Sequence, residues 1–344
     1  MLEKNEPYIL HVITKKGAGF EPAESERIKY HAISKIEATP TKGNPKFQDI
    51  FGKWLCNKAS QDQQLIGITP AMKEGSGMVD FEKLYPDRFY DVAIAEQHSV
   101  TFGAGLSLSG MKPVVAIYSS FLQRAYDQLI HDVCLENLDV TFALDRAGVV
   151  GEDGPTHSGN FDLAFMRCIP NLIILTPSDE NELWLALNTA YQFNGPAAVR
   201  YPRGSGIGQK VIENNEIIEL GKAKQIYSGK NCCILNFGVL LDRVNNTAKE
   251  NGYGLFDMRF VKPLDTEFLK KIHDKKLIVT IEDGSRYGGA GSAVQEWFAD
   301  NNLNVTIKSF GIPDVFIEHA SRDEMIRMAS LNEDAILDQI KKLI

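Results

Sequence analysis

The segment YDVAIAEQHSVTFGAGLSLSGMKPVVAIY, residues 90–118, decides the fold class. An apolar run at 90–95 is followed by a helical pattern that begins at Glu96, and a second apolar run follows at 113–118. A strand, a helix and a second strand in this order form a parallel pair whose crossover helix covers one face of the sheet. The same alternation recurs along the chain. We therefore predict an α/β protein of two domains, each a mostly parallel sheet flanked by helices.

The spacing of these elements predicts a first domain at residues 46–207 and a second at 215–344, separated by polar turns within 206–230. In the first domain we expect helices at 47–59, 96–110, 121–137 and 179–193, and strands at 65–70, 90–95, 113–118, 140–145, 172–177 and 197–202. In the second we expect strands at 232–238, 253–260, 276–283 and 305–310, and helices at 239–252, 291–302 and near the C-terminus.

The first 45 residues fit neither domain. YILHVIT, residues 8–14, has the apolar, β-branched character of a buried strand, and several Gly and Pro residues punctuate the stretch 15–45. A lone strand cannot bury itself. We therefore expect residues 1–45 to supply a last strand and a linker to the sheet of another domain or another chain.

Composition argues against several classes of partner. The 344 residues carry a net charge of −8, which disfavours binding to the phosphate backbone of nucleic acid. The sequence has no run of about 18 apolar residues and no cleavable leader, so we expect a cytoplasmic protein without a membrane span. The five cysteines form no C-x-x-C pair, and most lie in apolar runs, which predicts buried free thiols.

Ligands of open parallel sheets gather at the carboxyl ends of the strands, so residues that follow strands are candidates for a site. They are Glu96, Tyr118, Arg146 and Arg203, with Asp153 and His157 in the glycine-rich loop AGVVGEDGPTHSG at 147–159. Glu96 would also suit the first turn of a helix, where a carboxylate interacts with the helix dipole. His157 is either a surface residue or an acid–base group tuned by its neighbours. No spacing of His, Cys or Asp predicts zinc.

Several long motifs carry further information. They are HVITKKGAGFEPAE (11–24), DVAIAEQH (91–98), YSSFLQRAYDQLIHDV (118–133), DRAGVVGEDGPTHSG (145–159), PSDENE (177–182), AVRYPRG (198–204), DMRFVKPLD (257–265) and GGAGSAV (288–294). Together they extend over nearly the whole chain, and they resemble the 1-deoxy-D-xylulose-5-phosphate synthase family. The resemblance covers a linker, a pyrimidine-binding domain and a C-terminal domain of the transketolase type.

The resemblance implies a transferase that uses thiamine diphosphate. It places Glu96 against the N1′ atom of the cofactor's pyrimidine ring, where a carboxyl group activates the ring. Such a charge-assisted hydrogen bond is strongest in a dry site of low dielectric constant. It also assigns Phe121 to stacking on the pyrimidine, and Arg124 and Phe20 to further cofactor contacts.

For the substrates, the resemblance implies the condensation of pyruvate with glyceraldehyde 3-phosphate and the release of carbon dioxide. In this family the reaction is the first step of non-mevalonate isoprenoid precursor synthesis and feeds thiamine and pyridoxal synthesis. A phosphate monoester needs fixed cations and hydroxyl partners. The residues that the resemblance assigns to the substrates are Tyr118, Arg146 and Arg203 for binding, and His31, His157 and Asp153 for catalysis.

One motif of the family is absent from this chain. The family marks its diphosphate and magnesium site with Gly-Asp-Gly and a later Asn in an N-terminal domain, and the sequence has no Gly-Asp-Gly. We therefore expect the ligands of Mg²⁺ on a missing N-terminal domain and none in this chain. We expect a fragment, a split-gene product or a chain nicked in a larger protein, which binds thiamine diphosphate poorly and is inactive alone. The resemblance also implies a homodimer.

Other interpretations remain open. The β subunit of a 2-oxoacid dehydrogenase also pairs a pyrimidine domain with a C-terminal domain at about this length, and transketolase has the same layout. The GEDGPTHSG sequence at 151–159 and the pair of Arg146 and Arg203 favour a phosphorylated acceptor over lipoamide. A non-catalytic regulatory or assembly module is the alternative from a different class.

Overall fold

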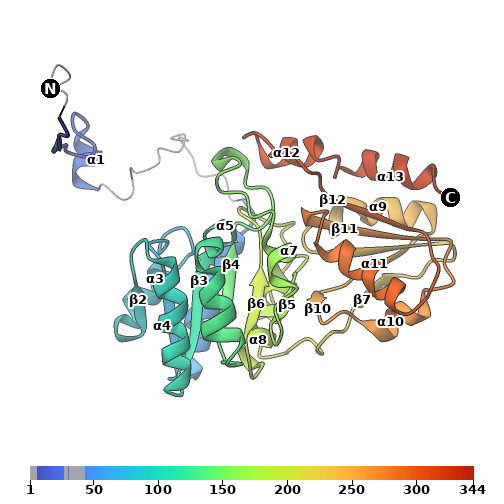
Figure 1. Cartoon of the computed structure of the whole chain (residues 1–344), viewed down its shortest axis with the longest axis horizontal. Helices are drawn as coiled ribbons and strands as arrows, with labels where there is room; N and C mark the ends of the chain where they lie inside the picture. Colours follow the sequence, from blue (N-terminus) through green and yellow to red (C-terminus); the bar gives the residue numbers. More distant parts are fainter. Residues whose placement is uncertain (1–5, 27–29, 31–42) are drawn as a thin grey trace. The chain divides into compact units, whose positions relative to one another are not determined.

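The computed structural model of the chain describes residues 6–26, 30 and 43–344 (Figure 1). The chain divides into two units, Met1–Gly43 and Asn44–Ile344, and the second unit contains both sheets. None of the helices in the described ranges combines the length and the apolar character needed to traverse a bilayer.

The first unit contains little regular structure in its described part. Its helix is α1 (Glu21–Ser25), and residues 8–14 form no strand. Ile9, in the middle of that apolar run, is 96% exposed. Residues 8–14 thus have no neighbouring strand to pair with in the described residues, and their pairing with the sheet of another domain or chain stays a prediction.

The larger sheet of the second unit has seven strands in the order β10-β5-β6-β4-β3-β1-β2. Its strands are β1 (Leu65–Thr69), β2 (Phe89–Asp91), β3 (Lys112–Tyr118), β4 (Thr141–Asp145), β5 (Ile173–Leu175), β6 (Ala197–Arg200) and β10 (Phe260–Lys262). β10 runs antiparallel to β5, and the other pairs are parallel. Parallel strands joined by helices confirm the predicted α/β architecture.

The second sheet has five strands in the order β12-β11-β8-β9-β7. Its strands are β7 (Lys224–Tyr227), β8 (Cys232–Phe237), β9 (Gly254–Asp257), β11 (Leu277–Ser285) and β12 (Ile307–Ile312). β7 lies in the stretch expected to hold only polar turns, and it pairs antiparallel with β9. This edge strand is exposed or half-buried, so its sequence lacks the apolar run that identified the other strands.

The strand predicted at 253–260 is divided between the two sheets. β9 ends at Asp257 in the second sheet, and β10 begins at Phe260 in the first. Arg259, between them, has a φ of +59°, a left-handed conformation that a continuous strand does not contain. The C-terminal half of the chain therefore adds an edge strand to the sheet of the first half.

Helices cover both faces of the larger sheet (Figure 1). The helices of the second unit are α2 (Phe47–Gln61), α3 (Val79–Leu84), α4 (Glu96–Leu108), α7 (Asp162–Met166), α8 (Glu180–Gln192), α9 (Leu241–Asn251), α10 (Thr266–Lys271), α11 (Ala290–Asp300), α12 (Arg322–Met328) and α13 (Glu333–Lys341), besides the short turns at 119–134. α2 and α8 share one hydrophobic cluster on one face, and α4 packs on the other face.

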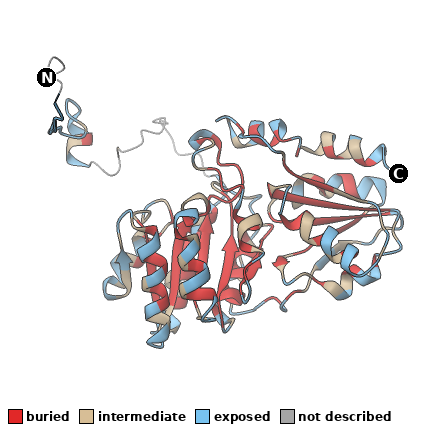
Figure 2. Cartoon of the chain, in the orientation of Figure 1, coloured by how far each residue is buried: buried red, intermediate tan, exposed pale blue. Residues whose placement is uncertain are grey.

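Successive residues of the central strand β3 point to opposite faces, as the period of a strand requires. Val114 and Ala116 pack in the cluster that contains Trp54 of α2. Val115 and Ile117 pack in the cluster on the side of α4. Both faces of the central strands are buried (Figure 2), which explains their continuous apolar sequence.

The helix predicted at 121–137 is broken into short pieces. α5 (Ser119–Leu122) leads into a 3₁₀ turn at Gln123–Ala125, and α6 (Tyr126–Gln128) leads into a wide π turn at Leu129–Cys134. Such irregular turns are often found near functional sites. A periodic apolar pattern does not reveal them, because the average direction of the segment remains helical.

All five cysteines are free. Cys134, Cys232 and Cys233 are buried, Cys56 is half-buried and Cys168 is exposed, so the predicted burial holds for most of them. Burial raises the pKa of the Cys134 and Cys232 thiols to about 12, which leaves them protonated and unreactive at neutral pH.

Charged side chains connect the two halves of the second unit. Glu182 of α8 accepts hydrogen bonds from Arg259 Nη2 at 2.8 Å and from Lys224 Nζ at 2.8 Å. Asp257 is fully buried nearby and accepts a hydrogen bond from Ser178 Oγ at 2.6 Å. Burial, and then the negative charge of Glu182, raise the pKa of Asp257 to about 7.

We expect Asp257→Asn to remove a pH dependence of stability. The Asp257 carboxyl has an ordinary pKa of 3.8 and a folded pKa of about 7, so the folded state binds more protons between these values. The stability that this group contributes is present below pH about 4 and is lost as the pH rises through about 7. Urea unfolding of both proteins should show the advantage of the variant growing by up to about 1.4 kcal/mol per pH unit and levelling off above pH about 7. A difference that does not change with pH would contradict the assignment.

Candidate active site

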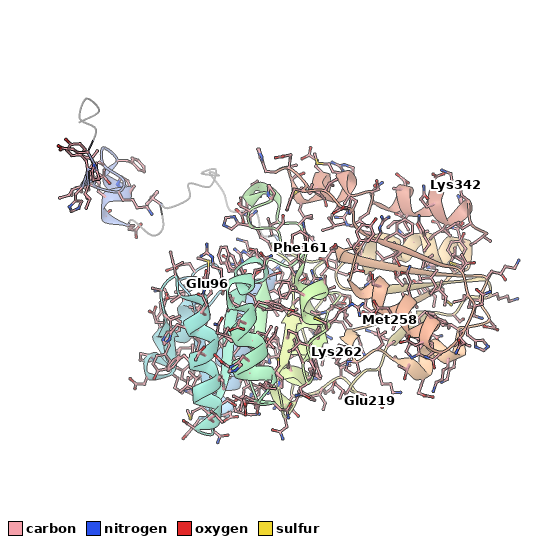
Figure 3. The ribbon with its side chains drawn as sticks, in the orientation of Figure 1. Glu96, Phe161, Glu219, Met258, Lys262 and Lys342 are labelled. Atoms are coloured by element: carbon pink, nitrogen blue, oxygen red, sulfur yellow. The ribbon has the colours of Figure 1, made fainter. Side chains whose placement is uncertain are left out.

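Glu96 lies at the start of α4, at the end of the helix nearest the carboxyl ends of the strands (Figure 3). The strand predicted at 90–95 ends earlier, at Asp91, because Ala93 takes a left-handed φ of +57°. The Glu96 side chain is buried, with the residue only 3% exposed. Its Oε1 atom accepts a hydrogen bond from Arg124 Nη1 at 3.2 Å.

The carboxylate of Glu96 does not cap its own helix. The N-cap residue of α4 is Ala95, which makes no side-chain cap, and within residues 44–344 the Glu96 carboxylate bonds only to Arg124. The Oε2 atom makes no hydrogen bond to these residues. Glu96 does lie in the first turn of α4, where its charge suits the helix dipole, and the carboxylate also has an oxygen available for a ligand.

A group of aromatic rings surrounds Phe121, three residues before the Arg124 that contacts Glu96. Phe121 stacks on Tyr118, with ring centroids 5.1 Å apart and an angle of 22° between the planes. His157 meets the other side of Phe121 edge-on at 5.5 Å. The guanidinium of Arg146 lies 4.3 Å from the Tyr118 ring. Burial raises the pKa of Tyr118 to about 12, so its hydroxyl remains a hydrogen-bond donor at neutral pH.

Arg146 is fixed by an unusual backbone and by several partners. Its φ is +62°, which is rare for a residue with a side chain and is typical of functional sites. Its Nη1 atom pairs with Asp145 and donates to Gln48 Oε1 at 3.0 Å and to Gly75 O at 2.7 Å. Burial raises the pKa of Asp145 to about 6, while the charge of Arg146 opposes this shift.

Arg203 holds the glycine-rich loop that follows β4. Its Nη1 atom donates to Val150 O at 2.9 Å and to Glu152 Oε2 at 2.6 Å. Its Nε atom lies 3.2 Å from Asp153 Oδ2. His157, in the same loop, shares a hydrogen bond of 2.9 Å between its Nδ1 atom and Thr156 Oγ1. The loop therefore carries the predicted site residues Asp153 and His157, and it is held by a third predicted residue, Arg203.

A cavity of about 490 Å³ opens between this loop and the C-terminal half of the second unit. Its cationic lining residues are Lys46, Arg146, Arg203 and Arg322, and its acidic ones are Glu152 and Asp323. Neither Lys46 nor Arg322 was predicted from the sequence. Lys46 precedes α2 and Arg322 begins α12, so neither follows a strand of the larger sheet, and no local signal would have identified them.

The remaining predicted residues belong to the first unit. Phe20 is exposed there and meets Tyr30 edge-on at 5.6 Å. His31 lies outside the described residues. The roles of both residues stay predictions.

The second unit offers partners for one end of thiamine diphosphate. Glu96 presents a buried carboxylate oxygen without a hydrogen-bond partner in residues 44–344, and Phe121 presents a half-buried ring, which together suit a protonated pyrimidine. For the diphosphate end, the described residues contain no group of three or more His, Cys, Asp or Glu side chains that could bind a metal ion.

Comparison with known proteins identifies the class. A family model for the transketolase pyrimidine binding domain matches residues 44–207, and one for the transketolase C-terminal domain matches 221–336. A solved structure described as "Split gene transketolase, inactive beta4 tetramer" has a TM-score of 0.78 and 26% identity, and the match covers 88% of this chain and 98% of that chain. The chain therefore contains two domains of the transketolase type, the pyrimidine-binding domain and the C-terminal domain.

The chain is also similar to 1-deoxy-D-xylulose-5-phosphate synthases. It is 53% identical to the synthase of Hahella chejuensis, over 99% of this chain and 54% of the relative. It is 50% identical to that of Francisella philomiragia, over 98% of this chain and 56% of the relative, and 53% identical to that of Cellvibrio japonicus, over 96% and 53%. The resemblance of the motifs is confirmed, and the chain spans about half the length of these relatives.

We expect Gly75→Ala to lower the stability of the protein by disturbing the packing of Tyr118 and Arg146. A Cβ atom at Gly75 would collide with Tyr118 Oη, and it would push on the carbonyl that accepts a hydrogen bond from Arg146. Overpacking of this kind lowers the free energy of unfolding by about 1–3 kcal/mol. Urea denaturation measures the change.

Gly105→Ala in α4 is the matched control, because a Cβ atom there meets nothing within 4 Å. It should leave stability unchanged or raise it by up to about 1 kcal/mol, since alanine favours a helix more than glycine does. Equal stability of Gly75→Ala and the parent would contradict the close packing described for Tyr118.

Proposed function

We propose that this chain provides the pyrimidine-binding and C-terminal domains of a 1-deoxy-D-xylulose-5-phosphate synthase. The reaction joins pyruvate and glyceraldehyde 3-phosphate to give 1-deoxy-D-xylulose 5-phosphate and carbon dioxide. The observation that carries the proposal is the buried carboxylate of Glu96 beside Arg124, in a chain about half identical to synthases of this name. The product, 1-deoxy-D-xylulose 5-phosphate, would then serve isoprenoid precursor synthesis, as in the synthase family.

When bound, thiamine diphosphate would supply the nucleophilic thiazolium carbon that decarboxylation of pyruvate requires. In the proposal, Glu96 donates a proton to, and then holds, the N1′ atom of the pyrimidine ring. Its burial excludes water and strengthens this hydrogen bond. Phe121 provides a flat apolar surface for the same ring, and Arg124 fixes the orientation of the Glu96 carboxylate.

The proposed substrate residues belong to the cavity, to the glycine-rich loop and to Tyr118. Arg146 and Arg203 provide guanidinium groups for the phosphate of glyceraldehyde 3-phosphate, because both line the cavity next to the loop. Tyr118 adds a hydroxyl that remains protonated. His157 and Asp153, on the loop, move protons at the carbonyl and hydroxyl oxygens of the substrates, with His31 as a further candidate.

We propose that the diphosphate group and Mg²⁺ are bound by an N-terminal domain outside this chain. The curated relatives are about twice as long as the matched part, and the second unit offers no metal-binding group in its described residues. Residues 1–45 would then form the last strand of that domain and the linker to it. The similar solved structure is described as a split gene transketolase in an inactive tetramer, which supports the proposal that this chain is inactive alone. The proposed homodimer with the partner domain follows from the resemblance to the synthase family.

Activity should appear when the chain is mixed with the separately expressed N-terminal domain of a curated relative. We expect 1-deoxy-D-xylulose 5-phosphate from pyruvate and glyceraldehyde 3-phosphate, and Glu96→Gln should lower the rate by about 10²–10⁴-fold, since proton transfer is lost. Glu136→Gln is the control, because Glu136 is an exposed carboxylate, and this variant should form product at the rate of the parent. Activity that requires lipoyl domains would support a dehydrogenase subunit, and no activity with any partner would support a non-catalytic module.

Thiamine diphosphate should bind weakly to the chain alone. Most of the contacts to its diphosphate lie outside the chain in the proposal, so calorimetric titration with thiamine diphosphate and Mg²⁺ should give a dissociation constant above the micromolar range. Addition of the N-terminal domain should tighten the binding. Micromolar affinity of the isolated chain would overturn the proposed division of the site.

A further inference from the structure

Arg322 is an arginine in the cavity wall whose side chain has no ion-pair partner among the residues that the structure describes. It is the first residue of α12, in the C-terminal half, and it lines the same cavity as Arg146 and Arg203. Its Nε atom is buried without a hydrogen bond, and its side chain forms no ion pair with any residue in the described ranges. A buried polar group without a partner is unfavourable unless a ligand satisfies it.

The other arginines of this region are neutralised. Arg146 pairs with Asp145, and Arg203 lies against Glu152 and Asp153. Asp323, the residue beside Arg322, is engaged in an ion pair with another arginine of the C-terminal half. Among the arginines that line the cavity, Arg322 is thus the one without an ion pair in the described ranges. Burial lowers its pKa, and the negative charges of Asp283 and Asp323 oppose this shift.

Contacts of the loop hold Arg322 close to Arg203. A Cβ atom built on Gly151 would lie 3.4 Å from the backbone nitrogen of Arg322 and 3.6 Å from Arg203 Nη1. The Gly151 N–H also donates to Met325 Sδ, at 3.2 Å, one turn into α12. The start of α12 and the Arg203 side chain thus meet at the same point of the loop, on the border of the cavity.

We propose that Arg322 is a further phosphate-binding residue, which brings a third guanidinium from the C-terminal domain to the phosphate monoester of the acceptor substrate. The inference rests on the proposed function, and it extends the phosphate site beyond the two arginines assigned from the sequence. A dianionic phosphate has enough oxygens for several guanidinium groups, and each charge-assisted hydrogen bond would satisfy N–H donors that the protein leaves free. A volume of about 490 Å³ suits a small phosphorylated sugar.

Binding of glycerol 3-phosphate to the whole chain tests the proposal without any turnover. We expect isothermal titration calorimetry at low ionic strength to show binding of glycerol 3-phosphate and none of glycerol. Arg322→Met should weaken the binding about tenfold or more, as expected for one lost charge-assisted contact. Arg322→Lys keeps the positive charge but lacks the paired N–H donors of a guanidinium, so it should recover part of the affinity for glycerol 3-phosphate.

Arg327→Met is the matched control, because Arg327 is exposed on the same helix and does not line the cavity. It should bind glycerol 3-phosphate as the parent does. Thermal melts with and without the ligand distinguish binding from folding, because a merely structural role would change the melting temperature but not its increase on adding ligand.

Parent-like affinity of Arg322→Met, or no binding of glycerol 3-phosphate by the parent chain, would overturn the assignment. Phosphate binding that depends on Arg322 while the mixture with the N-terminal domain forms no 1-deoxy-D-xylulose 5-phosphate would refute the proposed function and keep the phosphate site. If the mixture forms product and Arg322→Met changes neither the rate nor the KM for glyceraldehyde 3-phosphate, the proposed function stands and the role of Arg322 in phosphate binding is refuted.

Discussion

A buried guanidinium between two buried carboxylates joins the two sheets, and the site depends on it. Arg200, at the end of β6, donates from Nε to Asp162 Oδ2 at 2.8 Å and pairs through Nη1 with Asp283 of β11. None of the three residues is more than 3% exposed. Removing one member of such a cluster leaves an unpaired buried charge, which lowers stability by about 3–5 kcal/mol. The carboxyl ends of the two sheets are therefore fixed against each other.

The glycine-rich loop takes its shape from this junction. Gly148 has a φ of +70°, and a Cβ atom there would lie 2.7 Å from Asp283 Oδ2, so only glycine allows the chain to pass so close to the cluster. Further along, Gly154 also has a positive φ and faces His319 of the C-terminal half. The loop that carries Asp153 is thus packed against residues far away in sequence, and the site belongs to both domains.

Those site residues that directly follow an apolar strand could be predicted from the sequence. Glu96, Tyr118 and Arg146 were expected at a site because they follow apolar strands. In the structure Tyr118 contacts both Phe121 and Arg146, and Glu96 is buried beside Arg124. Arg322 follows no strand of the larger sheet. It was noticed because its buried Nε atom has no hydrogen-bond partner, and only the packing of the side chains reveals this. β10 escaped prediction for a similar reason, because a turn at Arg259 transfers the chain from one sheet to the other.

The π turn at Leu129–Cys134 restricts how this protein can vary in evolution. A turn of this type holds one residue more than an ordinary helical turn. Loss of one residue there would rotate the preceding segment by about 100° against the core, and Phe121 and Arg124 would point elsewhere. Insertions and deletions should therefore be selected against within 119–134 in related proteins.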